Sequence, residues 1–389
     1  MVTQEPIREA GVPPPKLIDG VGIWLFYPRT SRCEEIYIVG SIAADRYLTV
    51  PGSKLLAIQA FMRAVDGTKT LAQIQDSVVR EQGLAIEVEA LLRKFQRAGL
   101  LTESAFVQGR DIQQMSATVL RLPLDRLLRW FQRLSTLAWP TACLGAGLMA
   151  VAAVLIVRDP SLLQLMTKPV APDMSRMASL VQVALVASLS MTVHELSHCF
   201  AASQWGIRSG TVKFQLYLGT IPIVGLRLAG LYTLPLRGRL AVWGAGVFAN
   251  FSLAAGGLIG LRTVAPGSAA LELAVAMNWL LGVFNLMPLL PTDGYFLLCT
   301  LMKDSNVRLR AWSWIRRPVR HRRKRPSLFV LAYMIATVWL LLSTLWHLGL
   351  RLINAGANHS RWQSGLSLLF LAIFLVTLWR TFRRAGELE

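Results

Sequence analysis

Charged residues are scarce in this chain: they make up 16% of its 389 residues, against about a quarter in a typical soluble protein. Hydrophobic residues make up 53%. This balance excludes an ordinary soluble globular protein and indicates a membrane protein. Acidic residues are few outside residues 1–115, and the formal net charge is +19. We assign the excess of Lys and Arg to cytoplasmic loops that follow the positive-inside bias, in preference to a nucleic-acid-binding surface.

The chain also lacks the marks of a secreted protein. None of its four cysteines belongs to a Cys-x-x-Cys pair, so we expect no disulfide framework and a reducing compartment. These residues are Cys33, Cys143, Cys199 and Cys299. The first twenty residues contain no apolar core. We therefore expect no cleavable signal peptide and a cytoplasmic amino terminus.

Residues 1–110 are predicted to form a small cytoplasmic α+β domain of the winged-helix class. Short runs rich in β-branched and aromatic residues predict strands, and longer amphipathic runs predict helices. Three strands and then three helices are expected, at residues 22–28, 34–40, 45–50, 55–65, 71–82 and 85–101. Thr70 and Gln73 have the spacing of a capping box, which should begin the second of these helices.

This arrangement resembles the PqqD-like peptide-recognition domains of peptide-maturation pathways. The resemblance lies in the strands, the DGTKTLAQI turn and cap, and the closing LLRKFQRAGLL helix. It implies that the domain binds a peptide. A winged helix can also bind DNA, but Glu87, Glu89, Lys94 and Arg97 give the closing helices mixed charge in place of a basic recognition face. We therefore favour a peptide, and no nucleic acid, as the partner of this domain.

Residues 111–134 are predicted to be a basic amphipathic linker helix. Within it, residues 116–134 carry four arginines among leucines: Arg121, Arg126, Arg129 and Arg133. Two interpretations are equally consistent with this pattern. The helix lies on an anionic membrane face, or it is a plain cytoplasmic flank of the next span.

Long apolar runs follow, and a helix needs about 20 apolar residues to cross the hydrocarbon core of a bilayer. We predict an α-helical polytopic membrane protein with about six spans, at residues 135–157, 177–202, 239–262, 269–301, 327–350 and 363–381. The first four spans form a membrane core at 135–302, and the last two lie in a carboxy-terminal region at 327–389.

Basic residues are concentrated in alternate connectors, and this bias predicts the orientation. The connector at 203–238 and the loop at 303–326 are rich in Lys and Arg. The connectors at 158–176, 263–268 and 351–362 are poor in them. We therefore expect both termini in the cytoplasm, with the chain in the inner or plasma membrane of a prokaryotic cell. The basic loop anchors this topology and can bind anionic lipid.

The second predicted span ends in the sequence His-Glu-Leu-Ser-His at residues 194–198. On a helix, His194 and His198 project from one face, so both imidazoles can bind one Zn²⁺ ion. Glu195 can take a proton from a zinc-bound water, whose pKa the metal lowers to about 7. Two histidines and a glutamate inside a span are costly without a partner, and a zinc ion supplies one.

A tetrahedral catalytic zinc site needs a third protein ligand and an open position for water. Asp293 is the outstanding acidic residue of the spans. Pro288 and Pro291 remove backbone donors and break the helix before it, and Gly294 gives the backbone further freedom. It lies ten residues before Lys303, which places it at most about 15 Å from the cytoplasmic interface. We therefore expect Asp293 to turn inward on an unwound stretch and to meet the two histidines at one membrane depth.

Two motifs together resemble the paired signature of the site-2 protease family of intramembrane zinc metalloproteases. They are HELSH in one span and NLMPLLPTDG, residues 285–294, in a later one, and the resemblance covers about residues 177–302. Combined with the amino-terminal domain, the chain resembles peptide zinc metalloproteases found with peptide-maturation enzymes. Many members of the family have a proline where this chain has Leu290, followed here by Pro291. This departure concerns the local backbone path and not the ligands.

The resemblance implies a role for each site residue. His194, His198 and Asp293 would hold Zn²⁺, and Glu195 would be the general base. Asn285 matches an asparagine of the family that holds the substrate backbone or the oxyanion. Residues 135–302 would then be the zinc-dependent catalytic core.

Between the two motifs, residues 212–218 alternate between apolar and polar side chains, which is the period of a strand. We favour a re-entrant hairpin beside the site, whose free edge pairs with an extended substrate. The alternative is a cytoplasmic loop that packs on the spans.

Three functions fit these features. In the first, an intramembrane zinc metalloendopeptidase cleaves a ribosomally made precursor whose leader peptide is captured by residues 1–110. In the second, a regulatory intramembrane protease cuts a single-span membrane protein. In the third, a non-proteolytic membrane protein binds peptide or zinc for transport or immunity. The presence of Glu195 argues against the third, because metal binding alone does not need a base.

Overall fold

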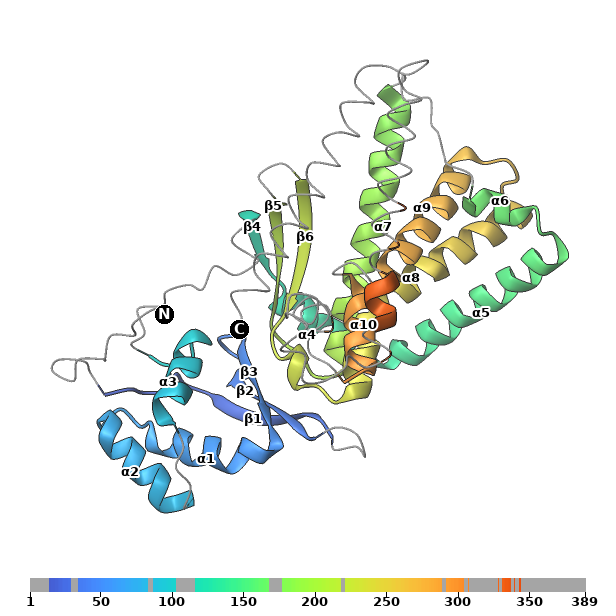
Figure 1. The fold of residues 1–389 in the computed structure, drawn as a ribbon. Coiled ribbons are helices and arrows are strands. Elements are labelled where there is room, and N and C mark those ends of the chain that lie inside the picture. Colours follow the sequence, from blue (N-terminus) through green and yellow to red (C-terminus); the bar gives the residue numbers. More distant parts are fainter. Residues whose placement is uncertain are drawn as a thin grey trace, which may run out of the picture. The chain divides into compact units, whose positions relative to one another are not determined.

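The computed structural model of the chain is shown in Figure 1. It describes residues 14–28, 34–82, 87–102, 116–167, 177–217, 221–288 and 292–303, together with 307, 328, 331–336, 339 and 343. Contacts divide the chain into two compact units. The first consists of Met1–Gly147 and Met191–Ala245, and the second of Leu148–Ser190 and Gly246–Glu389. Two long helices, α7 (Met177–Gln204) and α8 (Leu236–Thr263), each contribute residues to both units.

The amino-terminal domain begins with an antiparallel sheet of three strands in the order β1–β2–β3. The strands are β1 (Val21–Tyr27), β2 (Ile36–Ser41) and β3 (Arg46–Pro51). All three predicted strands are confirmed. The turn between β2 and β3 includes Asp45 with φ of 49°, a left-handed conformation that aspartate adopts more readily than most residues.

Three helices follow the sheet, after a short 3-10 turn. The 3-10 turn is η1 (Gly52–Lys54), and the three helices are α1 (Leu55–Ala64), α2 (Leu71–Gln82) and α3 (Val88–Arg97). The predicted capping box is present: Thr70 N–H donates to Gln73 Oε1 over 2.9 Å, and Gln73 N–H donates to Thr70 Oγ1 over 3.4 Å. Phe61 of α1 and Phe95 of α3 are fully buried, with ring centroids 4.9 Å apart. The domain therefore has an apolar core of its own.

A second antiparallel sheet has the order β4–β5–β6. Its strands are β4 (Ser116–Pro123), β5 (Gly210–Tyr217) and β6 (Ile221–Leu228). The strand predicted from the alternation at 212–218 and its antiparallel pairing in a hairpin are thus confirmed over residues 212–217; the re-entrant position and the pairing with a substrate stay predictions. The prediction of a linker helix over 111–134 is wrong at residues 116–123, which pair with β5; residues 111–115 lie outside the described part. The hydrogen-bonding partner of β4 is distant in the sequence, so a local pattern of side chains could not indicate the strand.

The rest of the linker is helix α4 (Asp125–Arg133), as predicted. Its apolar side packs inside the protein: Leu128 is fully buried, and Phe131 stacks edge-on against Phe200 of α7 with ring centroids 5.6 Å apart. Gly210 N–H donates to Asp125 Oδ1 over 3.2 Å, which ties the start of α4 to β5. The basic side chains of this helix are left exposed: Arg126, Arg129 and Arg133.

Among the described residues, four helices are long and apolar enough to cross a membrane: Ser135–Arg158, Val181–Gln204, Leu236–Thr263 and Ala269–Leu286. They belong to η3 (Ser135–Leu137) with α5 (Ala138–Arg158), to α7, to α8 and to α9 (Ala269–Leu286). They match the first three predicted spans and the first part of the fourth. Of the fifth, at 327–350, only a few residues are described, and the sixth, at 363–381, lies outside the described residues.

The fourth predicted span, at 269–301, is two helices and not one. Helix α9 ends at Leu286, and α10 (Asp293–Leu301) begins after an interruption. This confirms the break expected at the prolines. Helix α9 also lies close to α8, because a Cβ on Gly257 would be only 2.8 Å from the Val275 side chain. The remaining short elements are α6 (Leu162–Thr167) and η4 (Leu231–Thr233).

Candidate metal centre

Helix α7 places two imidazole rings on one side, as the four-residue spacing predicts. His194 and His198 are buried, with 2% and 5% of their surfaces exposed. Their Nε2 atoms are 3.1 Å apart, and the ring planes cross at 79°. Two nitrogens that each lie 2.0–2.1 Å from a tetrahedral zinc ion are about 3.3 Å apart. The histidine pair therefore already has the spacing of two ligands of one ion.

The other nitrogen of His198 is held by helix α8. Nδ1 of His198 donates to the carbonyl oxygen of Val242 over 2.6 Å. A carbonyl can only accept, so Nδ1 carries the proton and Nε2 of the neutral ring keeps its lone pair. Metal-binding histidines commonly donate their second N–H to a carbonyl or carboxylate in this way. No sequence pattern indicates this contact, because the acceptor is a backbone atom.

The close approach of α8 to the end of α7 makes this contact possible. Gly238 lies one turn before Val242, and a Cβ at Gly238 would be 2.9 Å from the indole ring of Trp205. A larger residue at position 238 would require the Trp205 ring to move.

Asp293 is the first residue of α10, directly after the interruption that follows α9. The Thr292 hydroxyl donates to the carbonyl oxygen of Met287 over 2.8 Å and so ties the two sides of the interruption together. A Cβ on Gly294 would lie 2.1 Å from the carbonyl oxygen of Leu286. Gly294 is therefore required for close contact between the start of α10 and the end of α9, whereas we had expected it to provide backbone freedom.

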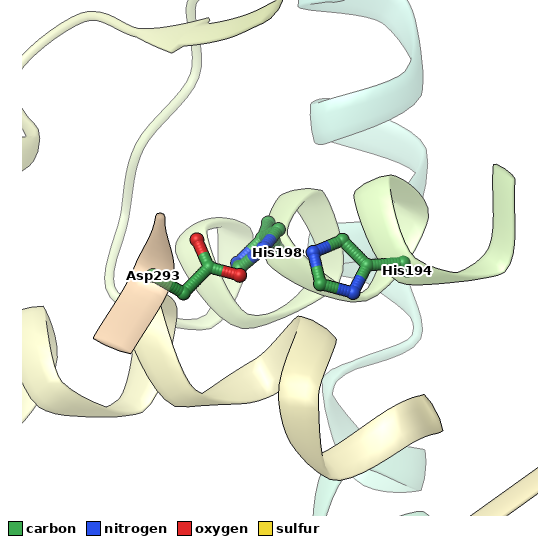
Figure 2. A group of neighbouring side chains, drawn as sticks. All are labelled: His194, His198 and Asp293. Atoms are coloured by element: carbon green, nitrogen blue, oxygen red, sulfur yellow. Dashed lines mark hydrogen bonds between the residues drawn. The ribbon is translucent and has the colours of Figure 1, made fainter. Parts of the chain in front are cut away.

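The structure brings the three predicted ligands together (Figure 2). One ligand atom from each of His194, His198 and Asp293 lies within 4.8 Å of the other two. The histidines are buried and the aspartate is half-buried. Glu195 and Cys199, although on the same helix, do not belong to this group. Two imidazoles and one carboxylate are a donor set that can hold a metal ion.

Of the remaining two predicted site residues, one lies on α7 with the histidines and the other lies on α9, the helix before the one that carries Asp293. Glu195 is half-buried on α7, next to His194 in the sequence. Asn285 is half-buried in the last turn of α9, two residues before Met287, where that helix has ended.

A second buried polar contact, which we did not predict, joins α7 to α9. Asn278 Nδ2 donates to Ser190 Oγ over 2.9 Å and to the carbonyl oxygen of Ala274 over 2.9 Å. Both side chains are at most 4% exposed. Ser190 lies one turn before His194, so this contact fixes α7 just ahead of the histidines. The sequence feature that could have indicated this contact is the presence of polar residues, Ser190 and Asn278, within apolar spans.

Comparisons with models of known protein families, with curated proteins and with solved structures found no match to this chain. The description of the site therefore depends on its own geometry.

Proposed function

We propose that this protein is an intramembrane zinc metalloendopeptidase of the site-2 protease type. The observation that carries the proposal is the group formed by His194, His198 and Asp293 on helices whose length and composition suit a membrane. Ionisable residues are rare at such positions and are generally found at functional sites. The motif HELSH supplies, in addition to two ligands, the carboxylate of Glu195.

Zinc is the metal that fits these donors best. Two neutral imidazoles and one carboxylate form a known type of catalytic zinc site, in which the fourth position stays open for water. Structural zinc sites are instead closed by four ligands and are rich in thiolates. Cys199 lies beside His198 in the sequence but does not belong to the group. Among the described residues, the group has three ligands and no thiolate, which favours a catalytic over a structural role.

Each residue then has a defined task in peptide hydrolysis. When bound, the ion supplies Lewis acidity that lowers the pKa of a water molecule to about 7 and polarises the substrate carbonyl. Glu195 takes the proton from the attacking water and later gives it to the leaving amine. Asn285 holds the substrate backbone or the developing oxyanion. His198, held through Nδ1 by Val242, keeps its ring in a fixed orientation during these steps.

The substrate we propose is a leader-bearing, ribosomally made precursor peptide that arrives from the cytoplasm. The amino-terminal domain is an α+β unit with a three-stranded sheet, and a leader can add a strand to the edge of such a sheet. The β4–β5–β6 sheet offers edges for the extended segment to be cut. A protease needs an extended substrate, because a helix keeps its carbonyl groups hydrogen-bonded.

The proposal is tested by purifying the full chain and measuring both its metal content and its cleavage of peptides encoded beside its gene. Glu195→Gln should keep the metal and lose about 10²- to 10⁴-fold in kcat, the usual contribution of a general base. Glu272→Gln, which changes a glutamate in the first turn of α9, is the matched control and should cleave like the wild type.

Two outcomes would contradict the proposal. If the purified wild-type chain binds no zinc, the three-residue group is not a zinc site. Cleavage by Glu195→Gln at the wild-type rate, with zinc bound, would mean that the HELSH motif is not the catalytic centre. A parallel reaction with a single-span membrane protein distinguishes a precursor peptidase from a regulatory intramembrane protease.

A further inference from the structure

The amino-terminal domain is fixed to the stretch of chain that leads into α8. We call residues 227–239 the anchor segment; it runs from the end of β6 through η4 to the first turn of α8. Arg227 forms an ion pair with the Asp45 carboxylate, and its Nη2 donates to the Asp45 carbonyl oxygen over 2.8 Å. Gly230 N–H donates to the hydroxyl of Tyr47 over 2.9 Å.

Aromatic side chains fill the same contact. The ring of Tyr232 lies 6.4 Å from that of Phe26 and 6.1 Å from that of Tyr47, between centroids. Burial raises the pKa of Tyr47 above its ordinary value. The hydroxyl that accepts from the anchor segment therefore stays neutral at physiological pH, and this hydrogen bond does not depend on pH in that range.

Arg239 is the most heavily buried charged residue in this contact, with 1% of its surface exposed. Its Nη2 donates to the carbonyl oxygen of Phe26 over 2.5 Å. Its guanidinium carbon lies 3.9 Å from the ring centroid of Phe26 and 4.7 Å from that of Tyr27. Burying a guanidinium is costly, and the Phe26 carbonyl and the two ring faces offset part of this cost. Arg239 therefore fixes β1 against the first turn of α8.

The next turn of α8 supplies the backbone carbonyl that orients the metal ligand His198. Val242 follows Arg239 by three residues, and its carbonyl accepts from Nδ1 of His198. A helix turn is rigid, so a displacement of Arg239 also displaces the Val242 carbonyl. An outer partner of this kind sets the orientation of a metal-bound histidine, and its loss typically costs about 10- to 100-fold in metal affinity.

We propose that Arg239 is a positioning residue that couples the amino-terminal domain to the metal ligand His198 through the Val242 carbonyl. The inference rests on the metal site of the proposed function. It adds a regulatory property: a partner that moves the amino-terminal domain on the anchor segment changes how His198 holds the ion. Peptide capture and the readiness of the site for catalysis are then linked within one chain.

The test measures metal affinity and the visible spectrum of the Co²⁺-substituted full chain, neither of which requires a substrate. Arg239→Met keeps the length of the side chain and removes its charge and donors. We expect Zn²⁺ affinity to fall by about 3- to 10-fold, less than for loss of the direct partner, together with a changed Co²⁺ spectrum. Arg239→Lys keeps the charge but not the planar group, so its effect should be intermediate.

Arg237→Met is the matched control, because Arg237 is an exposed arginine in the same first turn of α8. It should leave affinity and spectrum unchanged. Arg227→Met provides an independent variant, since it removes both contacts with Asp45 at the other end of the anchor segment. It should shift affinity in the same direction as Arg239→Met, by about 2- to 5-fold, the loss of roughly one surface ion pair.

A purely structural role for Arg239 would lower thermal stability and leave the Co²⁺ spectrum and the affinity as in the wild type, and that result would overturn the inference. If Arg239→Met does not fold, Arg227→Met decides, and wild-type metal binding in that variant overturns the inference. A wild-type chain without metal would instead contradict the proposed function, so the two failures are distinguishable.

Discussion

Two regions supply the ligands of the candidate metal centre, and they do so in opposite ways. Helix α7 is regular through His194 and His198, and the four-residue spacing alone places both rings on one side. The α9–α10 region is interrupted between Leu286 and Asp293. The position of Asp293 depends on this break, on the hydrogen bond from the Thr292 hydroxyl and on the close packing at Gly294. Periodicity therefore determines the first two ligands, whereas local packing determines the third.

This difference predicts that substitutions in the two regions lower zinc affinity for different reasons. Within the HELSH motif, positions other than the ligands and Glu195 should matter little for metal binding, because helix periodicity alone places the two rings. Around the interruption, neighbours of Asp293 that touch neither metal nor substrate should matter as well, because they set the position of the carboxylate.

The largest effect is expected from His194→Ala. Removing a ligand should lower Zn²⁺ affinity by more than the roughly 10- to 100-fold that loss of an outer partner costs. Ser197→Ala, in the same motif, removes only a hydrogen bond from the hydroxyl to the Val193 carbonyl within the helix, and it should bind zinc like the wild type. Chelator competition measures both. Equal affinity in the two variants would show that the histidine pair is not the metal site.

Gly294→Ala should be next in size, although it adds only one methyl group. A Cβ at that position would lie 2.1 Å from the Leu286 carbonyl oxygen, so α10 must move away from α9 and carry Asp293 with it. We expect a destabilisation of about 1–3 kcal/mol from overpacking and a clear loss of zinc affinity. Gly256→Ala in α8 is the control, since its nearest neighbour would be 3.7 Å away. Unchanged zinc affinity in Gly294→Ala would contradict the account of this region.

Thr292→Val should have the smallest effect. It preserves the shape of the side chain and removes the hydroxyl that donates to Met287. The loss of one hydrogen bond is worth about 1 kcal/mol, or roughly fivefold in zinc affinity at most. Thr263→Val removes a comparable 2.9 Å bond to Ile259 at the exposed end of α8 and serves as the control. A matching affinity in the two variants would mean that Thr292 does not position Asp293.

Sequence patterns correctly predicted the elements whose formation depends on residues close together in the sequence. The strands of the amino-terminal domain, the capping box of Thr70 and Gln73 and the helical face of the HELSH motif all follow from neighbours in the sequence. The break before Asp293 was also predictable, because proline removes a backbone donor.

Features that depend on distant parts of the chain were missed. Strand β4 forms only because β5 pairs with it, and the arginines and leucines of residues 116–134 suggested a helix instead. The Val242 carbonyl and the space required at Gly294 involve backbone atoms, which have no sequence signature. Arg239 had no neighbour in the sequence to indicate that its partner is Phe26.

The central claim is that His194, His198 and Asp293 hold one zinc ion. It is tested most directly by X-ray absorption spectroscopy of the zinc-loaded full chain. The account predicts a first shell of nitrogen and oxygen atoms at about 2.0–2.2 Å with the scattering pattern of two imidazoles. A sulfur atom at about 2.3 Å would mean that a cysteine such as Cys199 binds the ion, and it would contradict the proposed ligand set.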